Sequence, residues 1–349
     1  MEPEHARRWS RRPEGSNWGD FGPDDQLGTL NSITPENVRD GIAEVTEGMT
    51  FCLSLPLDRP GGTAVNKYRS EPILRPVRRE ADEVFYNFPV AGDRGVVSDD
   101  LAILHLQYST QWDALSHYGA LFDVFGDGDP VRVYYNGYRA GTDVWSSTDP
   151  ADAGMPTGRL ESSTAASHAL GIENIATKGM QTRGVLVDLR RHLGSSRTRV
   201  RYSDLAEILR IDDQRIGAGD IVLFHTGYAQ RVLEMDGRPD AAELDRTGAV
   251  LDGTDPELRE WIRETGIAAI AADNYAVERP PHDADPGGPV LPLHDLCLFR
   301  LGMPLGEMWH LTPLSDWLAE HRRSGFLLTA PPLRLPGAAG SPLTPIATV

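Results

Sequence analysis

The chain has 349 residues, with 51 acidic and 34 basic side chains and a formal net charge of −17 at pH 7. This acidic balance argues against a nucleic acid or an anionic membrane surface as partner, because binding to phosphates requires lysine and arginine. Hydrophobic residues make up 40% and charged residues 24% of the chain, so it can bury the core of a globular protein.

The cysteines and the N-terminal residues bear on the compartment. Cys52 and Cys297 both lie among apolar neighbours, which is typical of buried free thiols and implies no disulfide framework. Residues 1–12 are charged and lack the apolar segment of a secretory signal, and no run approaches the ~18 apolar residues of a membrane span. We therefore expect a cytoplasmic protein.

The N-terminal half predicts few regular elements. Residues 1–16 are polar, and we expect a flexible N-terminus there. Thr34, Pro35 and Glu36 supply a hydroxyl N-cap, a proline in the first turn and an acid, which predicts a helix to about Val45. The other expectations for this half are a strand at 49–56, an irregular stretch at 57–99, a buried strand at 101–108, and loops with short strands over 112–165.

From about residue 180, apolar runs alternate with helical patterns. Buried strands are predicted at 184–189, 220–224, 267–272 and 326–328, and helices at 203–209, 228–235, 255–266, 292–301 and from 312 onward. Apolar strands that alternate with helices indicate a sheet covered on both faces. No linker divides the chain, so we predict a single α/β domain over 17–349 with long irregular excursions.

A first cluster of polar side chains spans Gln107 to His117. It places Gln107, Gln111, Asp113 and His117 directly after the predicted strand at 101–108, a position where α/β proteins often build sites. A carboxylate with carboxamide oxygens could bind a divalent cation. On residue chemistry alone, a turn whose backbone groups these side chains satisfy is the stronger interpretation.

Two further clusters lie near the C-terminus. His294 ends a predicted helix, and the reversal at Gly302 could bring it to Glu307, with His310 close behind. Polar residues from Asp273 to Glu278 follow the strand at 267–272 and could line a pocket, although an Asx turn explains them equally well. His225 also follows a predicted strand, but no cluster of other candidate ligands lies near it in the sequence. The sequence contains no phosphate-binding glycine loop and no Gly-x-Ser-x-Gly elbow.

Together these segments resemble the cyclase family, which includes kynurenine formamidase, isatin hydrolase and trans-dienelactone hydrolase. The family signature His-x-Gly-Thr-His-x-Asp-x-Pro-x-His covers Gln107 to His117 here, with matches at Thr110, Asp113 and His117. Gln107 and Gln111 replace the two metal-binding histidines, and the run Ser-Thr-Gln-Trp-Asp looks like a variant found in one branch of the family. Further similar segments are Trp18–Asp25, Gly219–Gly227, Ile267–Asn274 and Leu301–Trp309, so the resemblance spans about residues 17–315.

The resemblance implies a mixed β/α/β fold of the swivelling-domain type, usually oligomeric, so a homodimer or homotetramer is expected. It also implies one divalent metal ion, manganese or zinc with magnesium as a further candidate, and hydrolysis of an amide or lactone. Carried over by position, Asp113, His294 and Glu307 become metal ligands, and His117 and Asp113 become catalytic residues.

The two glutamines leave three outcomes open for the metal. Gln111 could ligate directly, the site could hold one metal where relatives hold two, or this branch could have lost the metal, because a carboxamide oxygen binds zinc more weakly than an imidazole does. Our hypothesis is a metal-dependent hydrolase of a cyclic ester or amide or a related acyl bond, in which His117 moves the proton.

Two alternatives remain on the same fold. One is a cyclase, dehydratase or lyase of secondary metabolism, and the other is a non-catalytic protein that binds a small molecule. Several side chains could contact such a molecule: Trp18, Gln107, Trp112, Tyr118, Asn274 and Trp309. The aromatic residues in this set are as often part of a core, and the substrate itself is not identified by the sequence.

Overall fold

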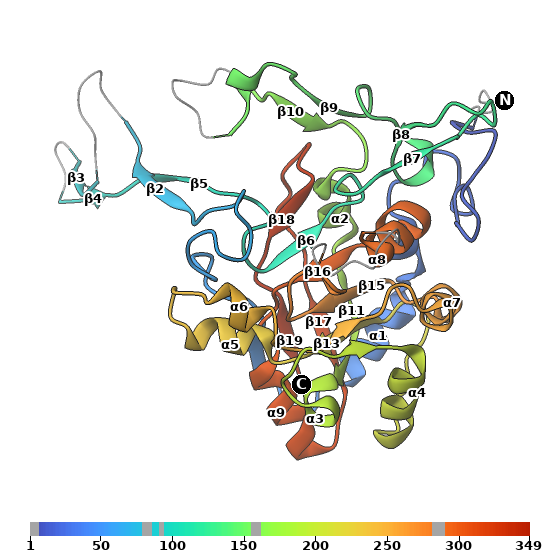
Figure 1. The fold of residues 1–349 in the computed structure, drawn as a ribbon. Coiled ribbons are helices and arrows are strands. Elements are labelled where there is room, and N and C mark those ends of the chain that lie inside the picture. The colour runs from blue at the N-terminus through green and yellow to red at the C-terminus, as the bar shows by residue number, and fades with distance from the viewer. Residues whose placement is uncertain (1–6, 79–85, 91–93, 155–161, 281–289) are drawn as a thin grey trace.

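The computed structural model describes residues 7–78, 86–90, 94–154, 162–280 and 290–349. Its centre is a mixed sheet of nine strands, around which helices gather in the lower part of Figure 1. In spatial order the strands are β1 (Thr50–Cys52), β19 (Ile346–Thr348), β17 (Gly325–Thr329), β11 (Gln181–Asp188), β13 (Ile221–His225), β15 (Ala269–Ala272), β16 (Leu305–Glu307), β6 (Gln111–Asp113) and β18 (Gly340–Pro342). The four strands from β11 to β16 are parallel, and every other pairing in this sheet is antiparallel.

The sheet is covered on both faces, which confirms the prediction from the apolar strands. Successive residues of β13 belong to different cores: Ile221 and Leu223 pack in one cluster, and Val222 and Phe224 pack in the other. This alternation follows from the pleat, which points neighbouring side chains to opposite faces. The predicted α/β class is therefore confirmed, and the two faces carry separate sets of helices.

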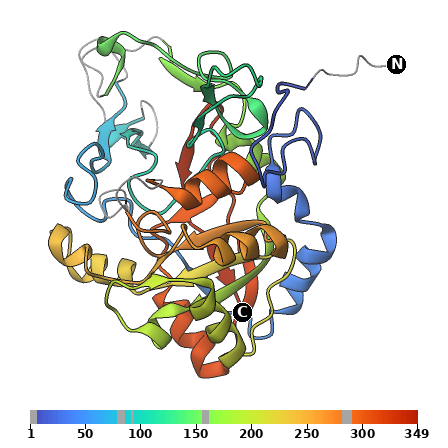
Figure 2. The ribbon, with the colours of Figure 1, turned by 45° about the vertical axis from the view of Figure 1, so that its right-hand side comes forward.

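Two of the predicted helices, α1 and α7, begin at the capping residues that the sequence indicated. The side chain of Thr34 accepts hydrogen bonds from Glu36 and Asn37 at the start of α1, and the side chain of Asp255 accepts one from Glu257 at the start of α7. The helices are α1 (Pro35–Ala43), α2 (Ile172–Lys178), α3 (Leu189–Leu193), α4 (Tyr202–Ile211), α5 (Tyr228–Glu234), α6 (Ala241–Leu244), α7 (Pro256–Thr265), α8 (Pro292–His294) and α9 (Thr312–His321). Figure 2 shows α1 running along one side of the body.

The segment predicted as one helix at 292–301 consists of an α-helical turn followed by a π-helix. Its first three residues form α8, and Asp295–Leu301 continue as a π-helix that ends at Gly302 in the left-handed region, with φ 59°. Such wider turns occur often at functional sites, because they change the direction in which the neighbouring side chains point. His294 is the last residue before this change.

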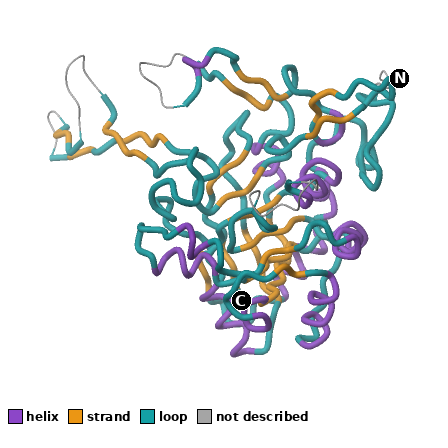
Figure 3. Tube along the Cα trace, viewed as in Figure 1, coloured by secondary structure: helices purple, strands orange, loops and turns teal. Residues whose placement is uncertain are grey.

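Long excursions leave the body from the N-terminal half. Their described residues form four short antiparallel pairs and two helical turns, seen in the upper part of Figures 1 and 3. Their strands are β2 (Ile73–Pro76), β5 (Asp100–Ile103), β3 (Phe88–Pro89), β4 (Val96–Val97), β7 (Ala120–Phe122), β8 (Val131–Val133), β9 (Val144–Ser146) and β10 (Ala165–Ser167). The 3-10 turns at Tyr135–Gly137 and Pro150–Asp152 belong to them, while Gly28–Ser32 precedes α1, and β12 (Arg199–Val200) pairs with β14 (Val250–Leu251) near α4.

Three sequence-based expectations need correction. The buried strand expected at 101–108 is wrong, because β5 ends at Ile103 and Leu101 is 44% exposed. Cys52 is exposed in the outermost strand β1, whereas Cys297 is buried as expected. Within the N-terminus expected to be flexible, Trp9 is buried edge-on against Trp18. In the part of the chain that the structure describes, no helix has the length and apolar character needed to cross a bilayer.

Candidate metal centre

The antiparallel pairing of β6 with β16 brings three polar side chains to one face of the sheet. Glu307 lies opposite Gln111, and Leu305 lies opposite Asp113. Residues paired across strands, and residues two apart along a strand, point to the same face, so Gln111, Asp113 and Glu307 share it. Leu305 packs in the core of this face.

His294 approaches the same place from α8. Its Nδ1 lies 2.9 Å from Oε1 of Glu278, a carboxylate that also accepts hydrogen bonds from the backbone N–H groups of Leu293 and His294. Glu278 thus fixes the first turn of the helix and the ring together. The Nε2 of His294 is left facing the two carboxylates of the sheet, 3.5 Å from Glu307 Oε1 and 3.9 Å from Asp113 Oδ2.

Asp113, His294 and Glu307 form a buried cluster with the spacing of a metal site. One ligand atom from each of them lies within 4.8 Å of the others, and all three residues are buried. Oδ2 of Asp113 has no hydrogen-bond partner among the described residues. A buried carboxylate oxygen without a partner is costly, and a cation would satisfy it. The residues present therefore fit a divalent ion.

The electrostatics of the cluster point the same way. Burial raises the pKa of Asp113, while the facing His294 keeps the pKa of Glu307 below its usual value despite burial. Burial alone lowers the pKa of His294, but Glu278 and Glu307 outweigh it and raise that pKa to about 10. A positive charge between these carboxylates is thus strongly favoured.

The two glutamines of the signature segment lie differently. Gln111 Nε2 donates to Oε2 of Glu307 at 3.1 Å and to Oδ1 of Asp113 at 3.4 Å, so its amide belongs to the cluster. The side chain of Gln107 lies over Gly340, whose added Cβ would stand 2.6 Å from Gln107 Nε2. Because Gly340 pairs with Asp113, Gln107 covers the sheet face that carries the cluster.

His117 and Tyr118 border the cluster on its more open side. His117 Nε2 lies 3.7 Å from Oδ1 of Asp113, and its side chain is 25% exposed, against 0% for that of Asp113. The ring of Tyr118 meets the ring of His294 edge-on, with centroids 5.8 Å apart. These two residues are placed to meet a molecule that approaches the cluster.

The three tryptophans considered as substrate contacts need correction, because all are fully buried in the cores. Trp18 packs on Phe299, whose carbonyl accepts from its indole N–H. Trp112 alternates with Gln111 and Asp113 on β6, so it points to the opposite face, where it packs edge-on against Trp309. Their indole N–H groups bind backbone carbonyls, which is the usual state of a core tryptophan.

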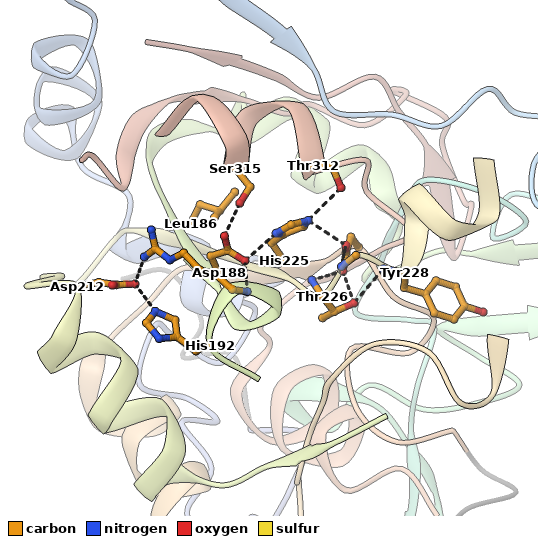
Figure 4. A network of polar contacts seen from close by, with 12 residues as sticks. Leu186, Asp188, His192, Asp212, His225, Thr226, Tyr228, Thr312 and Ser315 are labelled. Carbon is orange, nitrogen blue, oxygen red and sulfur yellow. Dashed lines mark hydrogen bonds and ion pairs between the residues drawn. The ribbon is translucent and has the colours of Figure 1, made fainter. Parts of the chain in front are cut away.

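Other sequence candidates lie around the sheet edge. The Asn274 side chain donates to the carbonyl of Ala249, and its backbone carbonyl accepts from Met308, next to Glu307. His310 contacts Gln230. His225 lies on the face away from the cluster, hydrogen-bonded to Asp188 and to Thr312 of α9 (Figure 4).

Two charged residues near the cluster were not singled out from the sequence. In the sequence, Glu278 was noted only as the last residue of a polar run after a strand, and its carboxylate side chain was the only feature that could have marked it as a site residue. Arg69 donates to the carbonyl of Gln107 at 2.6 Å, and its charge partly offsets the effect of burial on the pKa of both Asp113 and Glu307. It lies in a stretch without periodicity, so no pattern marked it.

The comparison with family models now decides the assignment. The model described as "Putative cyclase" matches residues 53–279, which include β6, the signature segment and Glu278. This chain belongs to the cyclase family. No curated protein matches the chain.

Solved structures agree with this family. The crystal structure of a novel cyclase shares 33% identity, covers 96% of this chain and 97% of that one, and superimposes with a TM-score of 0.71. Isatin hydrolase A from Labrenzia aggregata shares 15% identity, covering 90% of this chain and 98% of its own, with a TM-score of 0.55. An isatin hydrolase bound to the product analogue thioisatinate is similar at 13% identity, 91% and 99% coverage and a TM-score of 0.53. The cyclase fold of the chain is thereby shown.

Proposed function

We propose that this cyclase-family protein is a metal-dependent hydrolase of a cyclic ester or amide, or of a related acyl bond. The observation that carries the proposal is the buried cluster of Asp113, His294 and Glu307, in which Asp113 Oδ2 faces His294 Nε2 without a hydrogen-bond partner among the described residues. Isatin hydrolase, whose name describes the hydrolysis of the cyclic amide isatin, has the same fold as this chain.

The donor set indicates which ion would fit. Two carboxylates and one imidazole are ligands that zinc and manganese both accept, and magnesium is a further candidate. Turning the amide of Gln111 by 180° would bring its oxygen to the place that Nε2 now occupies, which adds a neutral ligand suited to manganese or magnesium. When bound, such an ion supplies a water of lowered pKa and a positive charge for the carbonyl oxygen.

The protein's own residues would divide the remaining work. Glu278 holds His294 with Nε2 toward the carboxylates. His117, which is partly exposed beside the buried Asp113, would take a proton from the attacking water and return it to the leaving group. Imidazole suits this task because it titrates near neutrality.

The first test is metal content. Elemental analysis of the purified protein should find about one manganese or zinc per chain, and Asp113→Ala should lose it while Asp129→Ala, in an exposed loop, keeps it. No metal after incubation with manganese, zinc or magnesium would overturn the proposal.

The second test separates metal binding from proton transfer. His117→Ala should retain the metal and lose turnover of the best substrate in a panel of lactones, cyclic amides and formamides by ~100-fold or more. Full activity in this variant would show that His117 has no part in the chemistry.

One contact favours a second candidate function. Gln111 donates from Nε2 to both carboxylates, which partly satisfies them without an ion. A metal-free cyclase, dehydratase or lyase on the same fold would use the cluster in this state. A product that lacks added water, formed in the presence of a chelator, would identify it.

A further inference from the structure

A large cavity lies beside the candidate metal centre. Its volume is about 750 Å³, in the range of small-molecule sites. It is bordered by residues 64–68 of an excursion, by the start of α5, by α6, and by the residues that follow β15. The walls are mainly apolar and aromatic, as expected for a site that holds an organic ring.

The floor of the cavity is connected to the cluster through one residue. Met308 follows Glu307 and packs in one apolar group with Tyr228 and Leu244, both of which line the cavity. Tyr275, another lining residue, packs against the same group. The backbone N–H of Met308 also donates to the carbonyl of Asn274, the residue before Tyr275, at 3.0 Å. The cavity and the cluster are therefore neighbours.

Positive charge gathers in this cavity, although the chain has a net charge of −17. Among the described residues that line it, Arg197 and Lys67 are cationic and Asp245 is the one carboxylate. Nε and Nη2 of Arg197 donate to the backbone carbonyls of Thr247 and Leu244, at 3.4 and 3.1 Å. These bonds hold the guanidinium in place, and a pre-oriented guanidinium is well suited to a carboxylate.

The phenol of Tyr275 adds a neutral donor. Its oxygen accepts a hydrogen bond from Asn66 Nδ2 at 2.9 Å, so its own O–H proton is available to another acceptor. Because burial raises the pKa of this phenol, it stays protonated at neutral pH. Cationic and neutral donors on apolar walls match a molecule that combines a ring with an anionic group.

We infer that this cavity is the substrate site and that the substrate is an organic anion, a ring or acyl chain whose carboxylate is held by Arg197 and Lys67. The apolar walls would hold the body of the molecule, and its acyl bond would point toward Glu307 past Met308. This inference rests on the proposed hydrolase function, which it narrows to carboxylate-bearing substrates.

Binding of two matched probes tests the inference on the full-length protein. Calorimetric titration with 3-phenylpropionate and with 3-phenylpropanol compares a carboxylate with a hydroxyl on the same ring and chain. The carboxylate should bind at least tenfold more tightly. The preference should persist in Asp113→Ala, where a carboxylate can no longer bind through a metal at the cluster.

Charge variants then assign the preference to the cavity. Arg197→Gln should abolish it, Lys67→Gln should reduce it several-fold, and Arg238→Gln, an exposed arginine that does not line the cavity, should leave it unchanged. Lys67 is exposed, so its variant decides the matter if Arg197→Gln does not fold. Equal binding of the two probes, or a preference that survives both Arg197→Gln and Lys67→Gln, overturns the inference.

The two proposals fail in different ways. A protein that binds one metal per chain but shows no preference for the carboxylate keeps the hydrolase proposal and loses the anionic substrate. A protein that prefers the carboxylate through Arg197 but binds no metal keeps the anion site and loses the metal-dependent hydrolase.

Discussion

Glu278 determines which nitrogen of His294 meets the two carboxylates of the cluster. As a buried carboxylate it accepts the Nδ1 proton, so Nε2 is the nitrogen that faces Asp113 and Glu307. Such a partner usually matters almost as much as the ligands, because it orients the ring and raises its basicity. Its role depends on a contact between segments 16 residues apart, which sequence alone did not reveal.

Replacement of this partner tests its role. Glu278→Gln should weaken the affinity for manganese or zinc by about 10- to 100-fold, because the amide is a poorer acceptor for the Nδ1 proton. Titration of the metal-free protein with the ion measures this affinity. The control is Asp273→Asn, which alters a buried carboxylate bound to Thr226 and Gly227 and should leave metal affinity unchanged. Equal affinity in wild type and Glu278→Gln would remove Glu278 from the site.

At the level of elements, the sequence predicted three of the four parallel strands, β11, β13 and β15, because each contains an apolar run, as in β13. The strands that hold the site were not predicted. β6 reads Gln-Trp-Asp and β16 reads Leu-Gly-Glu, three residues each, too short and too polar for a recognisable period. Only pairing with distant strands makes them part of the sheet. Conversely, the run at 101–108 looked buried by composition, but the strand ends at Ile103 and its first residues are exposed.

The same limit applied to the candidate site. Asp113, His294 and Glu307 were chosen by resemblance to the family, and the structure brings all three together. The identity of a residue as tryptophan could not show whether its side chain lines a pocket or packs in the core. The direction of Trp112 follows from the pleat of β6, which was not predicted as a strand.

The network around His225 docks α9 against the carboxyl ends of the parallel strands (Figure 4). Asp188 of β11 accepts from His225 and from Ser315 of α9, and His225 Nε2 lies 3.0 Å from Thr312 Oγ1. Asp273 lies 3.9 Å from the same ring. Contacts between buried charged groups of this kind make stability depend on pH.

The sign of that dependence follows from the two pKa shifts. Burial disfavours the charged form of both residues, but their mutual hydrogen bond outweighs it. This bond lowers the pKa of Asp188 to about 2. Together with the charge of Asp273 it raises the pKa of His225, although the nearby charge of Arg190 acts to lower that pKa. The His225 contribution is complete below its unfolded pKa of ~6.5 and is lost as pH rises through the folded value. The Asp188 contribution is complete above ~4 and is lost as pH falls toward about 2.

We therefore expect the network to stabilise the fold most between about pH 4 and 6.5, by roughly 2 kcal/mol for Asp188. Urea unfolding at pH 5.5 and 8.5 should show a larger loss of unfolding free energy in the wild type than in His225→Gln. His168→Gln, an exposed histidine, serves as the control and should behave like the wild type. Identical pH dependence in the wild type and His225→Gln would contradict this account.

On the scale of the whole molecule, the excursion formed by β2 and β5 is expected to need contact with another surface. A two-stranded ribbon is marginal by itself in water, and this one shows Leu74 and Leu101 at 68% and 44% exposure. Apolar side chains exposed on so small a ribbon are stabilised by contact with another surface, so we propose that this arm lies against a second copy of the chain in a homodimer or homotetramer.

Light scattering coupled to size-exclusion chromatography tests this assembly. The wild type should have the mass of two or four chains, and Leu74→Asp should lower it, because a buried aspartate at the interface would lack a partner. Ile211→Asp makes the same change at a 54% exposed aliphatic residue of α4, far along the chain from the arm, and should leave the mass unchanged. A monomeric wild type, or an unaltered mass in Leu74→Asp, would show that the arm is not the contact. Because residues 64–68 at the base of the arm also border the proposed substrate cavity, loss of the assembly should weaken binding of 3-phenylpropionate as well.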